Sequence, residues 1–77
     1  MHLTIKYFGM LAEITQRKEE DILFESDTIS DLLDSLCIKY PKLKGRSFQI
    51  AQNNELVSKE TKLQSSEIAL LPPFAGG

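Results

Sequence analysis

The segment TISDLLDSLCIKYP, residues 28–41, decides the fold predicted for this chain. Thr28 is a good N-cap, and Asp31 lies three positions later in a variant of the capping box. Pro41 stops the pattern because proline removes a backbone donor. Apolar residues recur between these signals with helical spacing, at Ile29, Leu32, Leu33, Leu36, Cys37 and Tyr40. The segment therefore predicts one main helix with one apolar face.

Segments with the pattern of strands lie on both sides of this helix. Residues 2–8, HLTIKYF, alternate, so Leu3, Ile5 and Tyr7 share a face. Residues 10–16, MLAEITQ, predict a short helix, and the charged RKEED run that begins at Arg17 predicts a bend. The other expected strands cover residues 21–25, 47–52, 55–57 and 67–71. This order predicts a two-layer α+β domain in which one sheet packs on one main helix.

Asn53 and Asn54 separate two of the expected strands and predict a tight hairpin, because asparagine tolerates positive φ better than most residues. With 77 residues the chain is long enough for one domain and too short for two. We therefore expect residues 1–77 to form a single domain.

Composition excludes several classes of function. The net charge of −2 argues against nucleic-acid binding, which needs a clustered basic surface. A lone cysteine, Cys37, and a lone histidine, His2, cannot supply a dedicated zinc site or a disulfide within the chain. No run approaches the roughly 20 apolar residues that span a membrane, and the first residues lack a signal-peptide layout. We expect a cytoplasmic protein without a bound cofactor or metal.

Once these classes are excluded, the segment that could supply a reactive group is the end of the chain, LLPPFAGG at residues 70–77. Pro72 and Pro73 fix two φ angles where the last expected strand ends. Gly76 and Gly77 let the backbone enter a passage too narrow for a Cβ atom. Six residues from Pro72 reach about 20 Å when extended. We therefore predict that residues 72–77 form a flexible tail that carries a reactive terminal carboxylate.

The sequence resembles the ubiquitin-like β-grasp sulfur carriers of the MoaD/ThiS family, and within it the small subunits of molybdopterin synthase. KYFGMLAEITQ is similar to the family's first strand and short helix, and TISDLLDSLCIKYP to its main helix. IAQNNELV is similar to the central hairpin, and LQSSEIALLPPFAGG to the family's ending. The chain departs from the family at Ser65-Ser66, where an acidic turn with glycine is common. The resemblance implies a mixed sheet of about five strands on one main helix plus a short helix.

The resemblance also implies a function for the tail. In this family a MoeB-like enzyme uses ATP to adenylate the terminal carboxylate, and a sulfur donor system converts it to a thiocarboxylate. The tail then enters a MoaE-like large subunit and gives its sulfur to cyclic pyranopterin monophosphate, forming the dithiolene of molybdopterin. Carried over by position, Gly77 bears the sulfur and Gly76 is its sterically permissive neighbour. The small subunit is not an enzyme alone, and the family suggests a heterotetramer.

Family positions that contact the partner correspond to Phe8, Leu56, Leu71, Pro72, Pro73, Phe74 and Ala75. An apolar patch on a small carrier is what a binding surface requires. For Phe8 and Leu71, ordinary burial in the core is the competing interpretation.

Three other functions stay open at this point. The chain resembles ThiS-like carriers of thiamine thiazole synthesis, although those chains usually lack the short helix at residues 10–16. It also resembles ubiquitin-like protein modifiers, which use the same kind of tail. A β-grasp interaction module with an inert tail is the remaining alternative.

Overall fold

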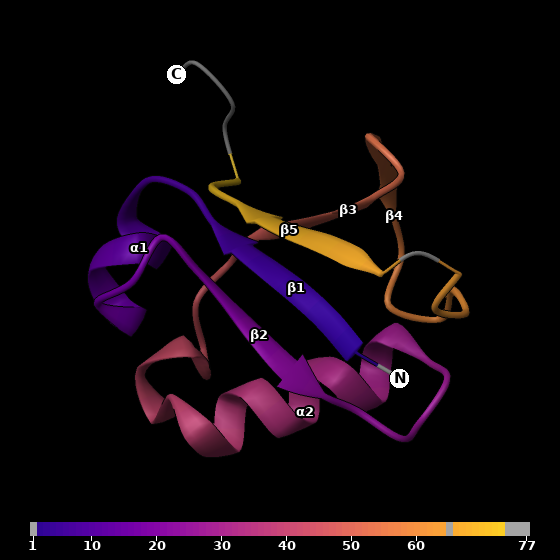
Figure 1. Cartoon of the computed structure of the whole chain (residues 1–77). Coiled ribbons are helices and arrows are strands. Elements are labelled where there is room, and N and C mark those ends of the chain that lie inside the picture. Colours follow the sequence, from indigo (N-terminus) through magenta and orange to yellow (C-terminus); the bar gives the residue numbers. More distant parts are fainter. Residues whose placement is uncertain (1, 65, 74–77) are drawn as a thin grey trace.

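The structure is a computed structural model that describes residues 2–64 and 66–73. Its elements, in chain order, are β1 (His2–Tyr7), α1 (Met10–Thr15), β2 (Glu19–Leu23), α2 (Ile29–Lys39), the 3-10 helix η1 (Pro41–Leu43), β3 (Gln49–Gln52), β4 (Glu55–Val57) and β5 (Glu67–Leu71). The strands form one sheet in the order β2-β1-β5-β3-β4. Strands β1 and β5 are parallel, and the other neighbours are antiparallel. Figure 1 shows α2 along one side of this sheet. The predicted mixed sheet on one main helix is confirmed.

The core lies between the sheet and α2. Strand β1 contributes Leu3, Ile5 and Tyr7, as its alternation predicts. The other fully buried side chains come mainly from α2 and β5 and include Ile29, Leu32, Leu36, Ile68 and Leu70. Burial of an aliphatic side chain of this size stabilises a fold by about 1.5–3 kcal/mol.

Helix α2 begins and ends where the sequence predicts. The Thr28 hydroxyl oxygen accepts a hydrogen bond from the Asp31 backbone N–H at 3.2 Å. The helix ends at Lys39, and Pro41 starts the short η1 turn, which the sequence analysis did not predict. Leu33 and Cys37 are only half-buried because they lie at the margin of the apolar face.

Three strands have bounds that differ from the prediction, the first of them β1, which ends at Tyr7 rather than at residue 8. Strand β2 covers Glu19–Leu23 rather than residues 21–25, so the charged run that predicted a bend enters the sheet. Its register with β1 pairs Ile5 with Glu20, which puts a carboxylate on the core side. Strand β3 begins at Gln49 rather than at residue 47. The hairpin prediction is confirmed, since Asn53 and Asn54 have φ of 55° and 63°.

Candidate tail base and docking face

The loop after β1 packs against the base of the predicted tail. Strand β5 ends at Leu71, and Pro72 follows directly. The Phe8 backbone N–H donates to the Leu70 carbonyl oxygen at 3.1 Å. Gly9 has a φ of +58°, and a Cβ atom added there would lie 2.7 Å from Pro72 Cγ. The Phe8–Gly9 turn therefore approaches Pro72 so closely that only glycine fits at residue 9.

A small apolar surface lies on the sheet face opposite α2. One register row carries Ala69 of β5, Ala51 of β3 and Leu56 of β4. Leu71 belongs to the same face, because its neighbour Leu70 points into the core. Phe8 follows the buried Tyr7 and extends this face at the end where β5 finishes. We call Phe8, Ala51, Leu56, Ala69 and Leu71 the docking face.

The exposure of the docking face supports a role in binding. Phe8 is 44% exposed and Leu56 is 61% exposed, although both are large and apolar. Leu71, Pro72 and Pro73 are half-buried. Ordinary burial in the core, the competing interpretation for both Phe8 and Leu71, is therefore wrong for Phe8, whereas the half-buried Leu71 does not decide it. Ala51 and Ala69 were not among the predicted site residues, and the signal for them was small side chains at alternating positions of adjacent strands.

Four predicted site residues, Phe74, Ala75, Gly76 and Gly77, lie outside the described residues. Their roles as partner-binding and sulfur-bearing positions stay predictions.

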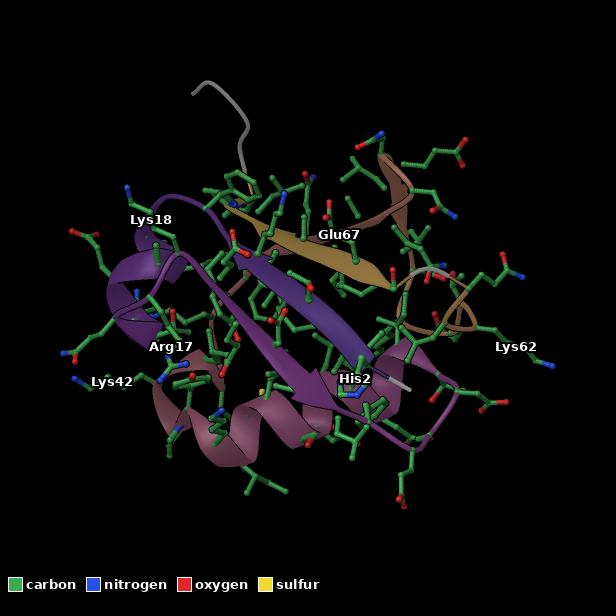
Figure 2. The ribbon with its side chains drawn as sticks, in the orientation of Figure 1. His2, Arg17, Lys18, Lys42, Lys62 and Glu67 are labelled. Carbon is green, nitrogen blue, oxygen red and sulfur yellow. The ribbon has the colours of Figure 1, made fainter. Side chains whose placement is uncertain are left out.

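Charged residues border the docking face. Lys6 Nζ lies 3.5 Å from a Glu67 carboxylate oxygen, and both side chains are substantially exposed. Figure 2 shows Glu67 on β5. Exposed pairs of this kind contribute at most about 1 kcal/mol. They supply a polar rim around the apolar surface.

A buried carboxylate fixes the segment that leads from α1 into β2. Glu20 is 6% exposed and accepts hydrogen bonds from the hydroxyl groups of Tyr7, at 2.5 Å, and Tyr40, at 2.7 Å. Its second oxygen accepts from Lys39 Nζ at 2.7 Å and from Arg17 at 3.4 Å. Figure 2 shows Arg17 at the end of the molecule that carries α1. The network ties three elements together beside the turn that contacts Pro72.

Burial by itself would raise the pKa of Glu20, but hydrogen bonds from Lys39, Tyr7 and Tyr40 outweigh it and lower that pKa below its usual 4.5. Burial and the Glu20 hydrogen bond raise the pKa of Tyr7. A carboxyl group whose pKa is lower in the folded chain than in the unfolded chain stabilises the fold at pH values above its unfolded pKa. This stabilisation is lost as the pH falls through the folded pKa. The acid side of the stability profile, below about pH 4.5, therefore depends partly on Glu20.

We expect Glu20→Gln to lower the free energy of unfolding at pH 7 by about 2 kcal/mol, because the charged hydrogen bonds to Lys39 and Arg17 are lost. The difference between wild type and variant should shrink as pH falls below 4.5. Urea unfolding at several pH values measures both effects. Glu19→Gln, at the exposed neighbouring position, is the matched control and should change stability by less than about 0.5 kcal/mol. A constant difference from pH 7 down to pH 3 would contradict the linkage.

The other side chains that could act as metal ligands or nucleophiles lie far apart in the fold. Cys37 is half-buried and His2 is exposed at the far end of β1 from α1 (Figure 2). Across residues 2–64 and 66–73, no three His, Cys, Asp or Glu side chains gather in a metal-binding arrangement. None of the helices in the described part of the chain has the length and apolar character needed to cross a bilayer.

The strand order, the parallel pairing of β1 with β5 and the single crossing helix define a ubiquitin-like β-grasp domain. A sequence profile described as the ThiS family matches residues 5–77. The chain therefore belongs to the ThiS family, and the resemblance noted in the sequence is confirmed at this level.

Solved structures with the same fold carry different functional names. SAMP1 from Haloferax volcanii matches with a TM-score of 0.81 and 25% identity, over 100% of both chains. A putative molybdopterin converting factor subunit 1 from Pyrococcus furiosus matches with a TM-score of 0.84 and 23% identity, over 96% of this chain and 99% of that chain. In Helicobacter pylori, a complex of subunits 1 and 2 of molybdopterin-converting factor contains a chain that matches with a TM-score of 0.62 and 29% identity, over 100% of both.

Proposed function

We propose that this chain is the sulfur carrier subunit of a molybdopterin synthase, with Gly77 as the residue that bears the sulfur. The observation that supports the proposal most strongly is the place where the folded domain ends and the tail begins. The last strand of a ThiS-family domain ends at Leu71, within the docking face, and six residues ending in Gly-Gly follow it. The Helicobacter pylori complex of subunits 1 and 2 supports a large-subunit partner of the MoaE type.

The chemistry of the tail follows from the properties of a carboxylate. A carboxylate is a poor electrophile, so it must first be activated. Its oxygen attacks the α-phosphorus of ATP on a MoeB-like enzyme, and pyrophosphate leaves. Hydrosulfide or a protein persulfide then attacks the acyl carbon, and AMP leaves. Hydrosulfide gives the Gly77 thiocarboxylate directly, whereas a persulfide gives an acyl disulfide, from which a second thiol takes the donor's sulfur as a disulfide and releases the thiocarboxylate. This ATP is consumed by the partner enzyme and is not bound as a cofactor of the carrier.

The partner then receives the thiocarboxylate. The docking face gives the large subunit an apolar surface to bind, while Pro72 sets the direction in which the chain leaves the sheet. The thiocarboxylate sulfur attacks a carbon of cyclic pyranopterin monophosphate, and the C–O bond at that carbon breaks so that the oxygen leaves. Water then cleaves the resulting thioester, which leaves the sulfur on the pterin and returns the free carboxylate of Gly77. Because molybdopterin holds two such sulfur atoms, two carriers serve each product. A heterotetramer with two carriers on a large-subunit dimer fits this requirement.

Protein modification is a second candidate function, because SAMP1 proteins of Haloferax volcanii and Methanosarcina acetivorans match with 25% and 29% identity. The same activated carboxyl group would then form an amide with a lysine amine. A ThiS-like role in thiazole synthesis would use the same thiocarboxylate with another acceptor. The three functions differ only in the group that attacks or accepts at Gly77.

Reconstitution with a large subunit tests the proposed function. We expect the thiocarboxylated chain to bind a MoaE-like subunit and to convert cyclic pyranopterin monophosphate to molybdopterin. Leu56→Glu should weaken this binding by about tenfold or more, because it puts a charge into an apolar contact. Ile38→Glu is the matched control, since Ile38 is 81% exposed on α2 and lies outside the docking face. Amide linkage to lysines without any molybdopterin would favour the modifier function.

A further inference from the structure

A second apolar surface lies where β4 leaves the sheet, apart from the tail. Leu33 of α2, Phe48 and Val57 line a shallow groove there. Each of these side chains is half-buried, so each still presents apolar surface to the groove. Leu56, a member of the docking face, also lines this groove, so the two surfaces meet at that residue.

The backbone along this groove is open. Strand β4 pairs with β3 only from Ile50 to Gln52, and the chain then turns from Val57 toward α2 (Figure 1). Ser47 and Phe48 therefore continue the line of β3 without a β4 neighbour. Among the described residues, neither one makes a backbone hydrogen bond. An extended segment in the groove would meet unpaired backbone groups as well as apolar side chains.

The charges at the rim of the groove have one sign. Arg46 and Lys59 both line it, both are exposed, and neither has a carboxylate partner among the described residues. Their backbones are fixed, because the Arg46 N–H donates to the Leu43 carbonyl at 3.1 Å and the Lys59 carbonyl accepts from the Ser30 N–H at 2.8 Å. Two uncompensated cations on fixed walls favour an anionic occupant.

We infer that this groove binds an extended peptide segment of a partner protein, with apolar residues at its centre and acidic residues beside them. The peptide adds a short strand along Ser47 and Phe48 in line with β4. Its apolar side chains pack on Leu33 and Val57, and its carboxylates pair with Arg46 and Lys59. The groove borders the docking face at Leu56, which belongs to both, and otherwise consists of residues outside that face.

The probe that tests this inference is a labelled peptide with a Val-Ile-Val-Leu centre and two acidic residues at each end. We expect it to bind the full chain, shifting the backbone NMR signals of Ser47, Phe48 and Lys59 and slowing hydrogen exchange at the Phe48 amide. The double variant Arg46→Glu, Lys59→Glu should bind it at least about tenfold more weakly. Lys42→Glu, Lys62→Glu is the matched control and should bind it as wild type does.

Several results would overturn the inference. These are no binding, equal binding of a peptide with lysines in place of the acidic residues, and shifts confined to the docking face. Concentration-dependent shifts at the same amides without peptide would assign the groove to a second copy. A change at these amides when the chain is cut after Pro73 would assign it to the protein's own tail. Thermal unfolding of each variant separates loss of binding from loss of fold.

Discussion

Gly76→Val is expected to fold like the wild type and to lose almost all formation of the Gly77 thiocarboxylate. Valine adds a branched side chain next to the reacting carboxyl group, and its stiff χ1 and restricted backbone prevent entry into a passage that fits glycine. Gly76→Ala adds only one methyl group and should retain part of the activity. The measurement is the fraction of chain converted by the activating enzyme, ATP and a sulfur donor.

The control for this prediction is the folded domain itself. Because residue 76 follows the end of β5 by several positions, the thermal midpoint of Gly76→Val should match that of the wild type. Addition of one alanine after Gly77 should abolish conversion as well, because the activated carboxyl group would no longer be on that glycine. Normal turnover by Gly76→Val would contradict the narrow-passage argument.

Gly9→Ala is the second change with a large expected effect. The backbone at Gly9 has a φ of 58° and a ψ of −134°, a region that alanine adopts only under strain. The new Cβ atom would also lie 2.7 Å from Pro72 Cγ, so Pro72 or the turn must move. We expect the free energy of unfolding to fall by about 3 kcal/mol, and activation of the tail to slow.

Gly45→Ala is the control that separates the effect of backbone strain from the effect of the contact with Pro72. Gly45 also has a positive φ, +85°, but a Cβ atom there meets nothing within 4 Å. Its substitution should therefore cost only backbone strain, about 1 kcal/mol. Pro72→Ala removes the Cγ atom that Gly9→Ala would meet, so the double variant should recover part of the loss. Equal destabilisation by Gly9→Ala and Gly45→Ala, with strictly additive double variants, would show that the contact does not hold the tail base.

Local signals in the sequence predicted the elements whose causes are local. The Thr28 cap, the apolar spacing of α2 and the Asn53-Asn54 turn all depend on residues that are close in the chain. The same holds for the alternation of β1, which identified the core side of the sheet. The exposed Phe8 and Leu56 were predicted from family positions rather than from pattern.

Features that depend on distant residues were missed. The charged run around Glu20 predicted a bend, because a carboxylate is costly to bury without partners. Its partners Tyr7, Lys39 and Tyr40 come from β1 and from the end of α2, so no local pattern reveals them. The contact of Gly9 with Pro72 likewise joins opposite ends of the chain. The groove exists only because β4 is short and turns away.

On the proposed function, this domain carries sulfur on its last residue. Incubation of the full chain with a MoeB-like enzyme, ATP and a sulfur donor, followed by intact-protein mass spectrometry, tests it most directly. We expect a mass increase equal to the replacement of one oxygen by sulfur, localised to the C-terminal peptide that ends in Gly77. The increase should require ATP and should disappear in the chain extended by one alanine. An unchanged mass in the presence of an activating enzyme that converts a known carrier would show that the chain is not a sulfur carrier.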